Sequence, residues 1–178
     1  MPTIIQSKKR RFYYSKIAKN AGTSVLRHIM QKDVDDLMQI NSHSVPDFVE
    51  ESDYYKFTIV RNPYERAVSL WLYLTQKVDG LRGMDFAQFL YYGIKYNNIT
   101  LDHSWPQYPM VIESGDIIRM ETLSESWQNV AKKIGVRAKV EKHNATQHGD
   151  YRQYYDSMTK RRVEELYCDD IKYLGYEF

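Results

Sequence analysis

The chain has 178 residues, of which 43% are hydrophobic and 27% are charged, so we expect a single domain over residues 1–178 with a substantial core. Its 25 basic and 23 acidic residues leave a net charge of +2, which gives no reason to expect a nucleic-acid partner. Cys168 is the only cysteine, which excludes an intrachain disulfide. The N-terminus has no apolar stretch long enough for a signal peptide or a membrane anchor, which predicts a soluble, cytoplasmic protein.

The first predicted strand covers residues 12–17 and follows a run of four basic residues, Lys8 to Arg11. Such a run resembles a nucleic-acid or localisation patch, but we interpret it as a solvated lead-in to the strand. The strand runs directly into a turn that contains Gly22. Apolar residues at helical spacing then predict a helix from about residue 23 to residue 31.

The clearest strand of the sequence covers residues 54–60. A good helix start follows it, because Asn62 can cap the helix and Pro63 fits its first position. Glu65 can reach back to the cap, as in a capping box. Residues 67–74 are apolar nearly all round, which is typical of a buried helix.

The rest of the chain continues the alternation of strands and helices. Residues 84–94 are expected to form a helix, and residues 116–120 a third strand. Residues 122–125 match a second capping box, which opens a helix ending at Gly135, and residues 163–174 follow helical spacing. The alternation indicates an α/β fold, a three-layer sandwich with a central parallel sheet, in which ligands bind at the carboxyl ends of the strands.

The first functional signal is the segment 16–24, which joins the first strand to the first helix. We expect its glycine to let the backbone turn tightly, so that successive N–H groups face an anion at the helix N-terminus. A lysine adds positive charge, and two hydroxyl groups add hydrogen-bond donors. The candidate phosphate-binding residues are Lys19, Asn20, Ala21, Gly22, Thr23 and Ser24.

This segment differs from the phosphate loop of magnesium-dependent nucleotidases. Lys19 precedes Gly22, whereas the lysine of such a loop follows its last glycine. The strand at 54–60 is followed by Arg61, where a magnesium-binding enzyme would be expected to place an acidic residue. The pattern therefore favours a phosphate that is held without a metal, although an ordinary strand–helix turn is the alternative.

The second signal is the segment 60–69. The guanidinium of Arg61 is suited to donate two parallel hydrogen bonds to a phosphate. Ser69 lies eight residues later, about two helical turns along, so its hydroxyl could meet the same anion, with a packing role as the alternative. For Arg66 an exposed salt bridge and a ligand role are both open.

Together the two segments resemble the 5′-phosphosulfate loop and the 3′-phosphate motif of sulfotransferases that use 3′-phosphoadenosine-5′-phosphosulfate (PAPS). Residues 18–24 and 61–69 match the motifs Pro-Lys-x-Ala-Gly-Thr-Ser and Arg-x-Pro-Tyr-x-Arg-x-x-Ser of the carbohydrate branch, the Golgi-type enzymes with heparan- or chondroitin-like acceptors. Ala18 replaces the proline, which loosens the turn. Residues 119–123 and 154–178 also resemble that branch, so the resemblance spans nearly the whole chain.

The resemblance implies a P-loop nucleotide-kinase-like fold and transfer of a sulfuryl group from PAPS, without a metal, to a hydroxyl or amine of a small molecule or glycan. Lys19 would be the catalytic lysine, which stabilises charge on the oxygen that leaves the sulfur. Arg61 and Ser69 would bind the 3′-phosphate. Residues 143–146 resemble a loop that closes over the cofactor.

A base must accept the proton of the acceptor, and a neutral histidine has a suitable pKa. His43 lies between the two motifs in a segment where related enzymes carry the base, so it is the first candidate, with a surface-loop histidine as the alternative. His103 is the second candidate, on a segment that resembles the acceptor side. There Trp105 and Gln107 could contact the substrate, although a packing role is equally open for Trp105.

Two other functions are compatible with these residues. One is a phosphotransferase of related fold, which the order of Lys19 and Gly22 and the position of Arg61 disfavour. The other is a domain that binds a nucleotide without catalysis, which the joint presence of Lys19, Arg61 and Ser69 disfavours. No His or Cys spacing supports a metal site.

Overall fold

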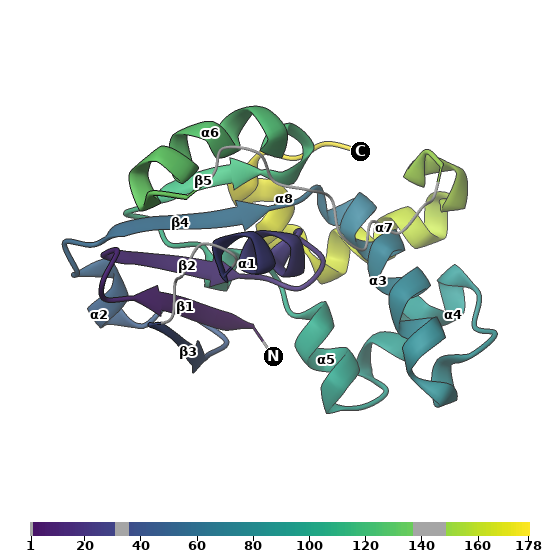
Figure 1. Cartoon of the computed structure of the whole chain (residues 1–178). Coiled ribbons are helices and arrows are strands. Elements are labelled where there is room, and N and C mark those ends of the chain that lie inside the picture. Colours follow the sequence, from purple (N-terminus) through teal and green to yellow (C-terminus); the bar gives the residue numbers. More distant parts are fainter. Residues whose placement is uncertain (1, 31–35, 137–148) are drawn as a thin grey trace. The chain divides into compact units, whose positions relative to one another are not determined.

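The computed structural model of the chain describes residues 2–30, 36–136 and 149–178 (Figure 1). Its internal contacts form two compact units, each made of two segments of the chain. The first unit comprises Met1–Val60 and Pro109–Ala145, and the second comprises Arg61–Tyr108 and Thr146–Phe178. A single domain over the whole chain therefore stays a prediction.

The first unit is built on a five-stranded sheet with the strand order β3-β1-β2-β4-β5. Its strands are β1 (Thr3–Ser7), β2 (Phe12–Lys16), β3 (Leu37–Asn41), β4 (Tyr55–Val60) and β5 (Asp116–Arg119). β2, β4 and β5 run parallel, as predicted, whereas β1 runs antiparallel to both β2 and β3. The α/β fold is thus confirmed, and the two strands that the sequence pattern missed make the sheet mixed.

The basic run of residues 8–11 is mostly exposed and leads into β2, as we expected, and it also forms the turn from β1, which we did not predict. Within it Arg10 donates from Nη1 to the carbonyl oxygens of Ile134 and Gly135, at 2.9 and 2.6 Å. These carbonyls belong to the C-terminal end of α6 (Leu123–Ile134), where backbone acceptors lack intrahelical partners and positive charge is favourable. Arg10 therefore caps that helix.

Two helices pack on the same face of this sheet. The core they share with β1, β2, β4 and β5 contains Val25 and Ile29 of α1 (Gly22–Met30) and Trp127 of α6. Trp127 is fully buried, with its ring centroid 6.2 Å from that of Phe57. Removal of a core side chain of this size costs about 3–5 kcal/mol, so the burial of Trp127 is a main stabiliser of the unit.

The first unit also contains α2 (Asp47–Glu50), which the sequence pattern did not indicate. The capping box predicted at residues 122–125 is wrong, because Thr122 ends a short 3-10 turn and its side chain makes no capping hydrogen bond. The predicted end of that helix is confirmed, since Gly135 adopts the left-handed conformation with φ of 69°.

The second unit is mainly helical and has an aromatic core. Its helices are α3 (Pro63–Lys77), α4 (Phe86–Tyr91), α5 (Asn98–Ser104), α7 (Ser157–Leu166) and α8 (Cys168–Leu174). Several tyrosine and phenylalanine rings pack edge to face. The ring centroid of Tyr64, for example, lies 5.0 Å from that of Phe178 and 5.9 Å from that of Tyr155. Such pairs add about 0.5–1.5 kcal/mol each beyond the burial of their area.

Two predicted helices of this unit are shorter than the sequence pattern indicates. The helix expected at 84–94 is α4 followed by a 3-10 turn at Gly93–Lys95, and the one expected at 163–174 breaks at Tyr167 into α7 and α8. Capping boxes that we did not predict open α4, α5 and α7, with Asp85, Asn97 and Asp156 as the capping residues.

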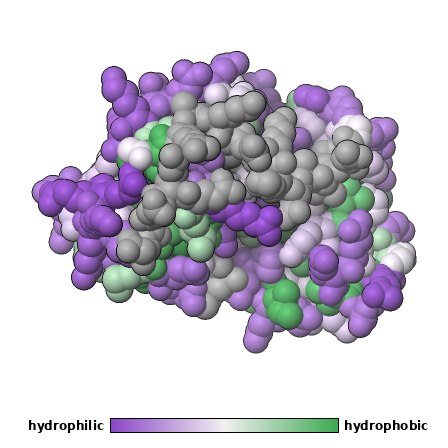
Figure 2. Space-filling model, in the orientation of Figure 1, coloured by the Kyte–Doolittle hydropathy of each residue, from purple (hydrophilic) through white to green (hydrophobic). Residues whose placement is uncertain are grey.

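Among the residues that Figure 2 colours, hydrophilic ones predominate at the surface, and hydrophobic ones are exposed in separate spots. Within the described residues, no helix combines the length and the apolar character that a membrane crossing requires.

Candidate functional site

The turn between β2 and α1 has an unusual backbone. Lys19 and Ala21 both adopt the left-handed conformation, with φ of 68° and 57°. This conformation costs roughly 1–2 kcal/mol for a residue that carries a side chain. Such turns direct successive N–H groups towards one point and form an anion-binding concavity. We therefore call residues 17–21 the anion turn.

Gly22 does not have the role that we expected. It begins α1 and is not among the glycines with positive φ, so the turn does not depend on its conformational freedom. A methyl group on Gly22 would instead lie 2.8 Å from Cγ of Lys16, which is closer than packed carbon atoms approach. The absence of a side chain at Gly22 leaves room for Lys16.

The anion turn is anchored to the sheet by Asn20. Its side-chain Nδ2 donates to the carbonyl oxygen of Ile59 in β4, at 2.8 Å, and the residue is fully buried. The first backbone bond of α1 joins Val25 N–H to the carbonyl of Ala21, at 3.0 Å. The amides of the first helical turn lack intrahelical acceptors, as at every helix start, and the turn holds them at the edge of the sheet.

The side chains at this helix start differ in their exposure. Ser24 is buried, Lys19 is half-buried and Thr23 is exposed. The first turn of α1 contains no acidic residue, so nothing within the helix offsets the positive end of its dipole. The arrangement is suited to an anion.

His43 lies in the loop that follows β3, at the same end of the sheet as the anion turn. Thr3 of β1 pairs with Lys16 on one side and with Asn41 on the other, so the carboxyl ends of β2 and β3 lie level. Two strand spacings separate them, about 10 Å. Because Lys19 follows the end of β2 by three residues and His43 follows the end of β3 by two, both belong to loops at this edge.

The loop that carries half-buried His43 is held on both sides of the histidine. Ser42 donates from its hydroxyl to the carbonyl of Ser44, at 2.6 Å. Val45 donates its N–H to the carbonyl of Pro109, at 3.0 Å. These bonds fix the backbone at the candidate base.

The second motif lies in the second unit, where the backbone of Arg61 is bracketed by Gln107. The N–H of Arg61 donates to Oε1 of Gln107 at 2.9 Å, and Nε2 of Gln107 donates back to the carbonyl of Arg61 at 2.8 Å. Gln107 is fully buried. We expected Gln107 to contact the substrate, but its amide is engaged with the peptide groups of Arg61, so its role here is to position that residue.

The side chain of Arg61 is 8% exposed and forms an ion pair with Glu65, with Nη2 and Oε1 3.0 Å apart. Glu65 therefore does not complete the predicted capping box. Arg61, Glu65 and buried Ser69 follow one another at intervals of four residues, which places Glu65 and Ser69 on one face of α3. The carboxylate of Glu65 orients the guanidinium at the start of this face.

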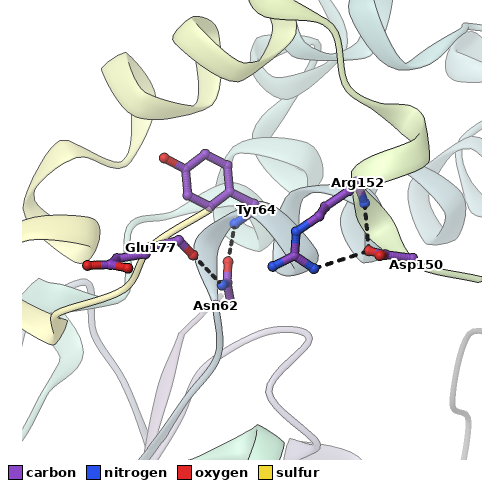
Figure 3. A network of polar contacts seen from close by, with 5 residues as sticks. All are labelled: Asn62, Tyr64, Asp150, Arg152 and Glu177. Carbon is purple, nitrogen blue, oxygen red and sulfur yellow. Dashed lines mark hydrogen bonds and ion pairs between the residues drawn. The ribbon is translucent and has the colours of Figure 1, made fainter.

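Asn62, the residue after Arg61, caps α3 as predicted. Its Oδ1 accepts from the N–H of Tyr64 at 2.9 Å, and its Nδ2 donates to the carbonyl of Glu177 at 3.0 Å (Figure 3). The C-terminal segment is thus tied to the start of α3. Figure 3 also shows Asp150 accepting from the N–H and the guanidinium of Arg152, at 3.0 and 3.3 Å.

A buried carboxylate, Asp170, supports Gln107 in turn. It accepts from the backbone N–H of Gln107 at 2.8 and 2.9 Å and from that of Tyr108 at 2.7 Å. Burial raises the pKa of Asp170, while the charge of Arg66 and these hydrogen bonds act in the opposite direction. Asp170 thus orders the loop whose glutamine holds Arg61.

Arg66 is 1% exposed, so it does not form the exposed salt bridge that we considered. Its Nη2 donates to the carbonyl oxygens of His103 and Trp105, at 3.1 and 2.8 Å, and its guanidinium lies over the ring of Tyr167 at 5.5 Å. Arg66 therefore holds the loop that leads from α5 to Gln107. The sequence offered no signal for this role beyond its place in the second motif.

His103 is half-buried, and its Nδ1 lies 2.7 Å from the carbonyl oxygen of Ile99. Because a carbonyl can only accept, Nδ1 carries the proton of the neutral ring and Nε2 is its basic nitrogen. This tautomer is the one that a second candidate base would need.

Half-buried Trp105 lines a pocket of about 160 Å³ in the second unit, together with apolar groups that include Leu101 and Leu166. This volume is similar to that of a cavity that holds one benzene ring, and it is below the roughly 300–1,000 Å³ of typical ligand sites. The pocket by itself cannot enclose a glycan. The loop predicted to close over a cofactor, residues 143–146, lies outside the described residues.

The mixed sheet, the anion turn after β2 and the helix that follows it define a P-loop-like α/β protein. A sequence profile of the sulfotransferase family matches residues 2–177. Since this match covers nearly the whole chain, the protein belongs to the sulfotransferase family.

A solved structure of a sulfotransferase from Alicyclobacillus acidocaldarius is similar at 17% sequence identity, with a TM-score of 0.34. The similarity covers 64% of this chain and 54% of that one, so this chain corresponds to about half of its relative's length. A comparison with curated proteins finds no match.

Proposed function

We propose that this protein transfers a sulfuryl group from PAPS to a hydroxyl group. The observation that carries the proposal is the anion turn, where two left-handed residues precede a helix start that has no acidic residue and whose first N–H groups lack intrahelical acceptors. These groups fit the 5′ end of the nucleotide, with Lys19, Thr23 and Ser24 as further ligands. Membership of the sulfotransferase family supports the same conclusion.

The second motif supplies the selectivity for PAPS. Arg61 directly follows β4, the parallel neighbour of β2, so both motifs come after adjacent strands of one sheet. In this proposal Arg61 and Ser69 hold the 3′-phosphate, which ATP lacks. A buried arginine held by Gln107 and Glu65 is preorganised for this task. An arginine here also favours PAPS over a magnesium nucleotide, whose metal needs a carboxylate.

Bound PAPS would supply a sulfuryl group, whose bond to the 5′-phosphate oxygen breaks while a bond from the acceptor oxygen to sulfur forms. Lys19 stabilises the negative charge on the leaving oxygen, an effect that in comparable sites is worth about 3–4 kcal/mol. His43 accepts the proton of the acceptor hydroxyl, with His103 as the second candidate. We propose a sugar hydroxyl as acceptor, on the resemblance to the carbohydrate branch.

The proposal is tested by calorimetric titration with adenosine 3′,5′-bisphosphate and with AMP. Because charge-assisted hydrogen bonds contribute roughly 1.5–3 kcal/mol each, the bisphosphate should bind at least about tenfold more tightly. Arg61→Met should remove this preference, whereas Arg161→Met, at an exposed site on α7, should keep it. Equal affinities for the two nucleotides in the unmodified protein would refute the assignment of PAPS.

A further inference from the structure

Lys16, the last residue of β2, begins the segment 16–24 but lies outside the motif match of residues 18–24 and was not among the candidate phosphate-binding residues. Its side chain is nevertheless held at the start of α1. The position that a methyl group on Gly22 would occupy lies 2.8 Å from Cγ of Lys16, 3.5 Å from Cδ and 3.4 Å from Cε. The whole hydrocarbon chain therefore runs along the first residue of the helix. The ammonium group is one bond further, within about 5 Å of the same position.

The ammonium of Lys16 has no hydrogen bond or ion pair among the described residues. Two other lysines of the first unit are engaged. Lys56 donates to two backbone carbonyls at the end of α2, and Lys133 pairs with Asp116 at 2.8 Å. Burial lowers the pKa of Lys16, which means that the surroundings of its ammonium group disfavour the positive charge.

The place of Lys16 is unfavourable for a cation unless an anion joins it. The N-terminus of a helix carries the positive end of its dipole, and α1 has no acidic residue in its first turn. An ammonium beside Gly22 is therefore repelled by the helix start. An anion that binds the amides of the anion turn would be attracted to both, and it would supply the acceptor that Lys16 lacks.

We propose that Lys16 is a second cation for the 5′ end of the nucleotide, where its ammonium donates to the oxygen atoms of the 5′-phosphosulfate alongside Lys19. This inference rests on the proposed function. It explains why residue 22 is a glycine although its φ does not require one, since any side chain there would displace Lys16. It assigns Lys16 to binding and to the orientation of the 5′ end.

The test is calorimetric titration of Lys16→Met with adenosine 3′,5′-bisphosphate and with adenosine 3′-monophosphate, which lacks the 5′ anion. Methionine keeps a chain that can pack on Gly22 and removes the charge. We expect about a tenfold or larger loss of bisphosphate affinity and no change for the 3′-monophosphate. Lys16→Arg should restore part of the loss, and Lys8→Met, at an exposed site in the turn before β2, should behave like the unmodified protein.

The outcomes separate the two proposals. If the unmodified protein binds the bisphosphate no better than either monophosphate, the proposed function fails. If it prefers the bisphosphate and Lys16→Met keeps that preference, the role of Lys16 alone is overturned. An equal loss for both ligands in Lys16→Met would also overturn it, because that pattern reports a general disturbance of the fold.

Discussion

Replacement of Gln107 by leucine should destabilise the protein and weaken nucleotide binding at the same time. Leucine has a similar volume and lacks both polar atoms, so the buried N–H and carbonyl of Arg61 lose their partners at 2.9 and 2.8 Å. A buried group left without a partner costs about 1–3 kcal/mol. With two such groups we expect a loss of about 2–4 kcal/mol in the free energy of unfolding, out of the roughly 5–15 kcal/mol of a typical protein.

Thermal unfolding measures this loss. For a chain of this length 1 kcal/mol shifts Tm by about 2–4 °C, so Gln107→Leu should lower Tm by roughly 5–15 °C. The matched control is Gln39→Leu, at an exposed position of β3, where we expect a change within about 0.5 kcal/mol.

The second readout is calorimetric titration with adenosine 3′,5′-bisphosphate, below the unfolding temperature of the variant. Because Gln107 holds the backbone of Arg61, its replacement should lower the affinity for the bisphosphate by about tenfold, which corresponds to about 1.4 kcal/mol. The affinity for AMP, which lacks the 3′-phosphate, should not change. If Gln107→Leu has the same Tm as Gln39→Leu and an unaltered affinity for the bisphosphate, the two hydrogen bonds between Gln107 and the backbone of Arg61 have no energetic role.

Three further variants test the proposed chemistry and one surface ion pair. Lys19→Ala should lower turnover more than nucleotide affinity, by a factor of roughly 100 or more, and near-native turnover would reject its catalytic role. His43→Ala should abolish sulfuryl transfer without loss of bisphosphate affinity, whereas unchanged transfer would point to His103. The hydrogen bond from Lys133 to Asp116 holds the pKa of that carboxyl below its usual value, so its stabilisation is present at neutral pH and is lost as the pH falls through about 4 and below. Asp116→Asn should accordingly lower Tm slightly at pH 7 and not at pH 3, and an equal effect at both pH values would contradict this linkage.

The elements predicted best are those in which a long periodic pattern meets a clear boundary. β4 and the cap of α3 are examples, since residues 55–60 form a buried strand and Asn62 and Pro63 begin the helix. The sequence pattern missed β1 and β3. β3 lies at the edge of the sheet, where its residues are half-buried or exposed, so it has no run of buried apolar residues. Such a strand depends on its neighbour more than on its own composition.

Local patterns also failed where two interactions compete for one side chain. Glu65 fits a capping box, but its carboxylate forms an ion pair with the guanidinium of Arg61, which lies four residues before it. Gly22 fits a tight turn, yet the left-handed residues are Lys19 and Ala21. Burial of Asn20 against β4 helps to hold them there, and no sequence pattern reports that contact.

The sequence by itself determined which residues make up the two motifs, because each consists of neighbouring residues on a strand end and the helix that follows it. Only the tertiary structure decided which residues hold them in place. Gln107 lies 46 residues from Arg61, and Asp170 lies 63 residues from Gln107, so no local spacing could indicate either contact. Their hydrogen bonds exist because burial leaves the peptide groups of Arg61 and Gln107 no access to water, and a partner from a distant part of the chain must replace it.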